Sequence, residues 1–250
     1  MKDSKPAKTP MDSGYLKLTD YGKPLEDSTV YRSLIGALLY IAVHARPDIS
    51  VSTSILGRRV SCPSDTDWTA AKRIVRYLLG TRDWKLEFTG TEEGLLGFCD
   101  ADWAGDQESR KSTTGYCFLL AGAAISWVSR RQPSVTLSSM EAEYMALSEA
   151  CQEVIWLRRL LLEMGCAQKK PTLINEDNQS CIAFVRSERS TKRSKHIETR
   201  EHFVKDLCQR KELQLVYCPT EEMTADILTK PLCVVKQRKF ASKIGMSVTH

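Results

Sequence analysis

Long apolar runs are missing from this sequence of 250 residues. The longest, residues 34–43, falls well short of the roughly 18 residues that span a bilayer. The first ten residues are polar and lack the hydrophobic stretch of a signal peptide. We therefore expect no membrane segment and no secretion, and we predict an intracellular protein of the cytoplasm or nucleus.

Regular cysteine and histidine motifs are also missing. The nine cysteines are scattered and include no C-x-x-C pair, and the four histidines are too few and too dispersed to complete a zinc site of standard spacing. These absences argue against a disulfide framework and a Cys/His zinc site. We expect the cysteines to be reduced and mostly buried.

The composition is that of an ordinary globular protein. Hydrophobic residues make up 42% of the chain and charged residues 27%, and 36 Lys and Arg against 31 Asp and Glu give a formal net charge of +5. A small basic excess favours a polyanionic partner without establishing one, because domains that bind nucleic acid by charge alone are more basic.

Changes in composition and periodicity divide the chain into four segments. Residues 1–27 are polar and lack apolar periodicity, which indicates an arm or linker that would be ordered only against a partner. Residues 28–82 have the period of helices, residues 85–232 mix strands and helices, and residues 233–250 remain as a C-terminal tail. The order predicts a small helical domain joined to an α/β domain.

The elements can be placed from turn and capping signals. Helices are expected at residues 28–46 and 47–62, followed by a third that is capped by Asp65 or Thr66 and ends at Gly80. Strands at 85–89 and 95–100 are expected to be joined by a turn at 90–94. The remaining expected elements are strands at 115–120, 124–128, 134–138, 172–175 and 213–218, and helices at 139–164, 178–185 and 197–208.

Four carboxylates fall at the ends of these elements. Asp100 ends an apolar strand, Glu143 lies in the first turns of the long helix, Asp177 follows the strand at 172–175, and Asp226 begins the last helical segment. Brought together, they would repel one another unless a cation lay among them, and such hard oxygen ligands suit Mg²⁺ or Mn²⁺. For each residue alone, a turn or cap role is the commoner explanation.

The residues around these carboxylates form an ordered series of motifs that resembles the ribonuclease H domain of Copia-type (Ty1/copia) retrotransposon Pol polyproteins. The matching stretches are FCDADWAGD at 98–106, RKSTTGYCF at 110–118, ISW at 125–127, LSSMEAEYMAL at 137–147, IWLRRL at 155–160, EDNQS at 176–180, KHI at 195–197 and ADILTKPL at 225–232. Upstream, YRSLIGALLY at 31–40, RPD at 46–48 and KRIVRYLLGT at 72–81 resemble the thumb or connection region of reverse transcriptase in the same polyproteins.

The resemblance implies a five-stranded mixed sheet flanked by helices, preceded by the helical region, and an endoribonuclease that hydrolyses the RNA strand of RNA-DNA hybrids. It implies two divalent ions, Mg²⁺ or Mn²⁺, with Asp100 bridging both. Glu143 and Asp177 would hold one ion, and Asp226 would help the other or position water. The family pattern selects Glu143 over Glu141, while Asp102 and Asp106 leave the first position less certain.

Hybrid binding requires contacts with phosphates on both strands. The candidates for these contacts are Arg110, Lys111, Ser112, Asn178, Gln179, Lys192, Arg193, Lys195, Lys72 and Arg76. Lys72 and Arg76 lie four residues apart and would share one helix face, where they could meet successive phosphates. The alternatives are a polar turn at 110–112, a solvated basic loop at 186–195 and a solvated helix face.

Two features of the family are missing from the sequence. Residues 216–226 contain no histidine, although cellular ribonucleases H carry one before the last carboxylate, and no Asp-Asp pair of a polymerase palm occurs. Polymerase activity is therefore not expected, and other parts of a Pol polyprotein are possible partners. The alternative to an active nuclease is a catalytically silent remnant that binds nucleic acid.

Overall fold

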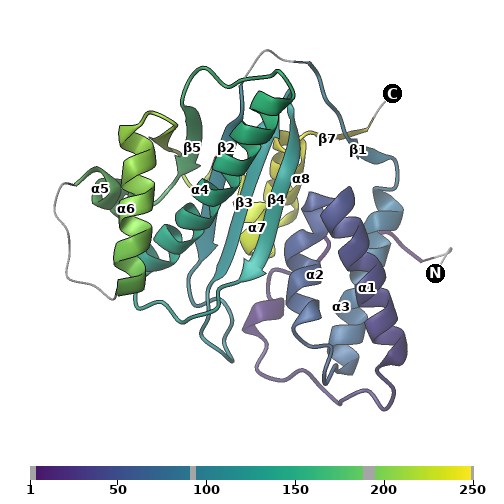
Figure 1. The fold of residues 1–250 in the computed structure, drawn as a ribbon. Helices are drawn as coiled ribbons and strands as arrows, with labels where there is room; N and C mark the ends of the chain where they lie inside the picture. The colour runs from purple at the N-terminus through teal and green to yellow at the C-terminus, as the bar shows by residue number, and fades with distance from the viewer. Residues whose placement is uncertain (1–3, 91–93, 188–194, 249–250) are drawn as a thin grey trace.

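A mixed sheet lies at the centre of the molecule, with helices against both faces and a bundle of helices beside one edge (Figure 1). The computed structural model describes residues 4–90, 94–187 and 195–248, of which residues 195–201 are described by their backbone. Helices α1, α2 and α3 lie beyond strand β4, and α5 and α6 lie at the opposite side of the sheet (Figure 1).

The N-terminal region is helical, as expected. A short 3-10 helix, η1 (Tyr15–Lys17), precedes α1 (Thr29–His44), η2 (Pro47–Ile49), α2 (Ser50–Gly57) and α3 (Asp65–Gly80). The second helix ends at Gly57, earlier than residue 62. The cap of α3 is Ser64 rather than Asp65 or Thr66, because Ser64 and Asp67 form a capping box in which each side chain accepts from the other's backbone N–H.

Five strands form the main sheet, in the order β4-β3-β2-β5-β6. They are β2 (Leu96–Asp102), β3 (Thr113–Leu120), β4 (Ala123–Arg131), β5 (Thr172–Glu176) and β6 (Leu213–Tyr217). Strand β3 runs antiparallel to β2 and β4, whereas β2, β5 and β6 are parallel. The expected five-stranded mixed sheet with flanking helices is thus confirmed.

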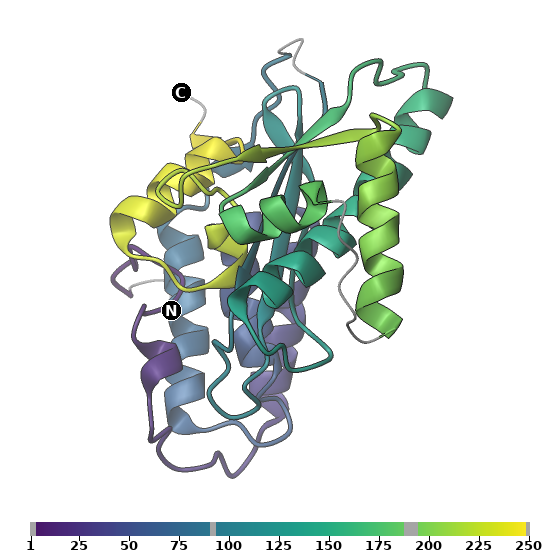
Figure 2. The same cartoon turned by 90° about the vertical axis from the view of Figure 1, so that its left-hand side faces the viewer.

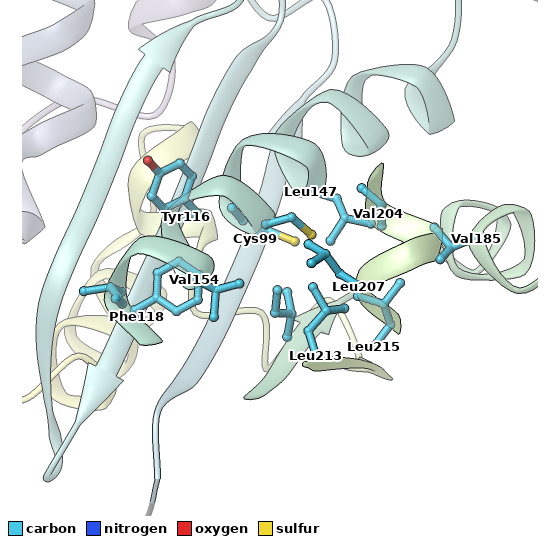
Figure 3. Close-up of a cluster of buried hydrophobic side chains, with 14 of the residues drawn as sticks. Cys99, Tyr116, Phe118, Leu147, Val154, Val185, Val204, Leu207, Leu213 and Leu215 are labelled. Carbon is cyan, nitrogen blue, oxygen red and sulfur yellow. The ribbon is translucent and has the colours of Figure 1, made fainter. Parts of the chain in front are cut away.

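Alternation along the strands divides the core into two layers. Cys99 of β2 and Tyr116 and Phe118 of β3 pack under α4 (Ser139–Glu163), α5 (Gln179–Arg186) and α6 (Lys195–Gln209). Figure 3 shows this layer, with side chains of α4, α6 and β6 around Cys99. Phe98 and Cys117 face the other way, toward α7 (Asp226–Thr229) and α8 (Val234–Lys243). The two faces of the sheet are therefore both covered.

The expected hairpin at 85–100 is wrong. Strand β1 (Trp84–Leu86) pairs antiparallel with β7 (Met246–Val248), at the far end of the chain, in a separate two-stranded sheet. Leu86 and Trp84 pack there against the layer that holds Phe240 and Met246. Residues 234–248, expected as part of a tail, therefore form a helix and a strand with buried side chains.

The strand expected at 134–138 is absent, because these residues form an irregular connection that leads into α4. Ser138 ends this connection as the N-cap of α4, its Oγ accepting from the N–H of Glu141 at 3.2 Å. The apolar side chains of this segment, Val135 and Leu137, are exposed rather than packed. Alternation of apolar and polar residues alone therefore misidentified the segment.

Part of the polar arm is ordered against the chain's own helices. Met11 and Tyr15 are buried in the core of the helical region. Arg73 donates to the Thr9 carbonyl at 3.2 Å, and Arg76 donates to the Lys5 carbonyl at 2.6 Å. No separate partner is needed to fix this segment. Among the described residues, none of the helices has the length and hydropathy that crossing a membrane requires.

A buried ion pair joins the helical region to α8. Arg46 donates from Nε and Nη2 to the two oxygens of Asp48, both at 2.8 Å, and the Tyr77 hydroxyl donates to Asp48 Oδ2 at 2.7 Å. The Asp48 carbonyl accepts from Gln237 Nε2 of α8 at 2.9 Å. Asp48 is fully buried, so the stabilisation of its charge depends on Arg46 and Tyr77, which donate to its carboxylate.

Replacing Asp48 should therefore destabilise the whole fold. We expect Asp48→Ala to lower the free energy of unfolding by about 3–5 kcal/mol, because Arg46 would remain buried without its partner. Asp83→Ala, which removes an exposed partner of Arg82, is the matched control and should change stability by less than about 1 kcal/mol. Chemical denaturation measures both, and equal effects would contradict the role of the buried pair.

Candidate active site

Asp100 lies on β2 where the sheet opens. The pairing of β2 with β5 ends at Phe98 opposite Asn175, two residues before Asp100. On the other side Asp100 lies opposite Gly115 of β3, where a Cβ atom would come within 2.5 Å of Thr229 Cγ2. The missing side chain lets α7 lie directly on the sheet, and the Thr229 hydroxyl donates to Asp100 Oδ2.

Glu143 reaches the same place from α4. Three small residues, Ala101 of β2 and Ala142 and Ala146 of α4, pack together and let the helix start lie close to the strand. Gln132 Nε2 fixes this start by donating to the Ala142 carbonyl at 2.9 Å. Glu143 is buried, and its Oε2 has no hydrogen-bond partner among the described residues.

Asp177 directly follows β5. Its Oδ2 accepts from the Thr220 hydroxyl at 2.7 Å. The preceding Glu176 is fully buried, accepts from the N–H of Asn178 at 3.0 Å and lies 3.3 Å from Cys99 Sγ. Glu176 is thus fully buried with Cys99 and Asn178 as partners, whereas Asp177 is only partly buried.

Three of the four expected carboxylates meet. Asp100, Glu143 and Asp177 each offer an oxygen, and these atoms lie within 4.8 Å of one another. A buried carboxylate oxygen without a hydrogen bond is costly in water-free surroundings, and a cation would satisfy it. The donor set is all oxygen, so the residues fit Mg²⁺ or Mn²⁺.

The fourth carboxylate, Asp226, lies with lysines. It begins α7 and is fully buried. Lys230 Nζ is 2.7 Å from Asp226 Oδ1 and 3.7 Å from Asp100 Oδ2, and Lys236 Nζ is 3.7 Å from Asp226 Oδ2. Asp226 is therefore linked to Asp100 through Lys230.

Burial, together with the neighbouring carboxylates, raises the pKa values of several acidic groups in the site. Burial, reinforced by Asp100, Glu176 and Asp177, raises the pKa of Glu143 well above its usual range. Burial and the Asp100 charge raise the pKa of Asp226 to about 7 despite Lys230, and burial raises the pKa of Asp102 to about 6. Burial also raises the pKa of Asp177. Perturbed carboxyl groups of this kind are typical of functional sites.

The expected phosphate-binding residues differ in their availability. Arg110 is exposed and Lys111 half-buried in the loop between β2 and β3, and Gln179 is exposed in the first turn of α5. Ser112 does not fit the expectation: it is fully buried, and its Oγ lies 3.1 Å from Thr136 Oγ1. Asn178 caps α5, accepting from the N–H of Cys181 at 2.9 Å.

Two further groups of basic residues were expected to contact phosphate, one at 192–195 and one on α3. Lys192 and Arg193 lie outside the described residues, and Lys195 begins α6 with its backbone alone described. On α3, Lys72 Nζ lies 5.5 Å from the Trp68 ring centroid, and Arg76 already binds the Lys5 carbonyl. The helix face that carries this pair is therefore partly covered by the chain itself.

Sequence reasoning missed the groups that hold the carboxylates. These are Thr220, Thr229, Lys230 and Lys236. One signal was available: Lys230 follows Asp226 by four residues, the spacing at which opposite charges pair on a helix. Thr220 and Lys236 reach the site through the tertiary structure, which no local spacing indicates.

Comparisons with known proteins agree on one group of relatives. No family model matches the chain. It is 40% identical over 250 residues to the "Retrovirus-related Pol polyprotein from transposon TNT 1-94" of Nicotiana tabacum, covering 96% of this chain and 18% of that protein. It is 37% identical over 247 residues to the corresponding polyprotein from transposon RE2 of Arabidopsis thaliana, covering 98% and 17%. The chain thus spans less than a fifth of these relatives.

Two further similarities are shorter. "Secreted RxLR effector protein 161" of Plasmopara viticola is 52% identical over 129 residues, which are 51% of this chain and 90% of that protein. Among solved structures, LC11-RNase H1 covers 54% of this chain and 91% of its own, with a TM-score of 0.42 and 16% identity.

The crowded carboxylates predict a pH dependence for the metal-free protein. Because folding raises the pKa values of Glu143 and Asp226, the folded state binds more protons than the unfolded state above about pH 4. The free energy of unfolding should therefore fall as the pH rises through about 7. Glu143→Gln should reduce this fall and stabilise the metal-free protein at pH 8 by about 1–2 kcal/mol.

The matched control for this prediction is Glu141→Gln. Glu141 is two residues away, and its Oε2 accepts from the N–H of Leu137 at 2.8 Å instead of facing the cluster. Denaturation in a chelator at pH 5 and pH 8 compares the variants. A Glu143→Gln protein that is no more stable than Glu141→Gln at pH 8 would contradict the clustering.

Proposed function

The chain belongs to the family of retrovirus-related Pol polyproteins of Copia/Ty1-type transposons, and on that premise we propose that it is a divalent-metal-dependent endoribonuclease that hydrolyses the RNA strand of RNA-DNA hybrids. The observation that carries the proposal is the meeting of Asp100 of β2, Glu143 of α4 and Asp177, which directly follows β5, although the three are far apart in the sequence. The family resemblance supplies the reaction, and the geometry supplies a site suited to it.

The carboxylates would hold the cation that the reaction needs. A divalent cation bound here would lower the pKa of a water ligand and stabilise the negative charge that develops during phosphoryl transfer. The chain's own groups fix the ligands: Thr229 donates to Asp100, and Thr220 donates to Asp177. Hydrolysis adds the water oxygen to phosphorus and breaks the bond to the 3′ oxygen, which leaves a 3′ hydroxyl and a 5′ phosphate.

The substrate surface would lie at the same end of the sheet. Arg110 and Lys111 lie in the loop that connects β2, the strand that carries Asp100, with β3. Gln179 adds an exposed amide at the start of α5, two residues beyond Asp177. These groups would bind phosphates and position the backbone, and they would read no base sequence.

The expected second ion would need Asp226. Its two carboxylate oxygens face Lys230 and Lys236 in the structure. One ion is therefore readily supplied with ligands by the described residues, and the fourth carboxylate serves Lys230.

Cleavage of a labelled hybrid tests the proposal directly. We expect the RNA strand to be cut only with Mg²⁺ or Mn²⁺ present, and a chelator to abolish the cutting. Asp100→Asn should reduce the rate at least about 100-fold, because it removes a carboxylate that would bind the cation together with Glu143 and Asp177. Asp206→Asn, which removes an exposed partner of Arg210 on α6, should retain activity. Hybrid that is bound and stays intact at high enzyme concentration would favour a silent nucleic-acid-binding remnant instead.

The binding surface has its own test. Arg110→Ala with Lys111→Ala should weaken hybrid affinity for all sequences and lower the slope of log affinity against log salt by about 1–2, since each lost phosphate contact releases about one counterion fewer. Salt-dependent binding titrations with the Asp100→Asn background prevent cleavage during the measurement.

Lys72→Ala with Arg76→Ala provides the comparison on α3. If this variant lowers the slope of log affinity against log salt by a similar amount, α3 contacts the hybrid, as the sequence suggested. If the slope is unchanged, this pair serves the packing of the N-terminal arm. If the Arg110 and Lys111 variant binds with unchanged affinity and slope, the proposed surface is wrong.

A further inference from the structure

Lys230 is positioned between two carboxylates that a second metal ion would have to share. Its Nζ lies 2.7 Å from Asp226 Oδ1 and 3.7 Å from Asp100 Oδ2, and its side chain is 34% exposed. Lys236 approaches the other oxygen of Asp226 at 3.7 Å. Each carboxylate oxygen of Asp226 thus lies within ion-pair distance of an ammonium group, although neither oxygen accepts a hydrogen bond among the described residues.

We infer that Lys230 is a built-in cation that takes the place of a second divalent ion between Asp100 and Asp226, so that the site holds a single ion on Asp100, Glu143 and Asp177. This inference rests on the proposed function, because it concerns the ion that the nuclease would use. It assigns Lys230 as a positioning residue: the ammonium acts on the ligands Asp100 and Asp226.

The local structure holds Lys230 in this place. Asp226 and Lys230 are four residues apart and flank the single turn of α7, so their side chains meet on one face. Gly115 lets α7 lie against β3, and Thr229 and Lys230 approach the same Asp100 oxygen, Oδ2.

The remaining carboxylates have the opposite arrangement. Asp100, Glu143 and Asp177 form the group of described residues whose oxygens could share one ion, and Asp226 is not a member of that group. Glu143 Oε2 has no hydrogen-bond donor among the described residues. Both oxygens of Asp226 also lack a hydrogen bond among the described residues, but each forms an ion pair with a lysine, whereas no described ion pair involves Glu143 or Asp177.

Counting bound ions tests the inference without relying on catalysis. Titration of Mn²⁺ into the metal-free full chain, followed by calorimetry and electron paramagnetic resonance, should give one ion for the natural protein and two for Lys230→Met, which leaves Asp100 and Asp226 free to bind another. The matched control is Lys239→Met. Lys239 contacts Glu222 and not the cluster, so one ion is expected.

Thermal melting in a chelator gives a second readout. Lys230→Met should melt about 3–6 °C below the natural protein, because two neighbouring carboxylates lose their cation, and Mn²⁺ should raise its melting temperature more than that of the natural protein. Adding Asp226→Asn to Lys230→Met should restore most of the metal-free melting temperature and return the count to one. If Lys230→Met does not fold, Lys230→Arg should still bind one ion.

The outcomes separate this inference from the proposed function. The role of Lys230 would be overturned if the natural protein bound two Mn²⁺ ions. It would also be overturned if the natural protein and Lys230→Met bound the same number of ions and had the same melting temperature in chelator. Either result would leave the proposal of a metal-dependent nuclease intact. No ion on the natural protein, together with intact hybrid, would overturn both.

Discussion

Repulsion among buried carboxylates at the opening between β2 and β5 is the constraint on which the rest of the site depends. Asp100, Glu143 and Asp177 are brought within reach of one another by packing that has nothing to do with charge: the alanines between β2 and α4, and Gly115 under α7. The packing of the fold therefore offsets an electrostatic cost that a bound cation would remove.

Two kinds of positive charge can offset this repulsion: lysine side chains of the protein and a divalent cation from solution. Lysines supply it on the α7 side, where Lys230 and Lys236 surround Asp226. On the α4 side no described residue forms an ion pair with Glu143, and its buried Oε2 has no hydrogen-bond partner, so a divalent cation would have to come from solution. Elsewhere, Arg46 neutralises the buried Asp48 and thereby couples the helical region to α8. Charge compensation and folding are thus linked at both places.

Much of the architecture follows from the sequence, because long amphipathic patterns and capping residues are local signals. Helices α1 and α4 and the five sheet strands lie close to their expected positions. The pairing of β1 with β7 could not be predicted, since the partner lies at the other end of the chain. The strand expected at 134–138 failed because alternation does not reveal whether a side chain will be packed, and Val135 is exposed.

The four carboxylates were identified from motifs, but their unequal surroundings were not. Ser112 was expected to contact phosphate, but it is buried, and its Oγ accepts from the N–H of Ala104 at 3.1 Å. The most direct test of the account is a crystal structure of the full chain with Mn²⁺, using anomalous scattering to locate the ion. The account predicts one site on Asp100, Glu143 and Asp177, with Lys230 still at Asp226. Manganese between Asp100 and Asp226, or none at the three carboxylates, would contradict it.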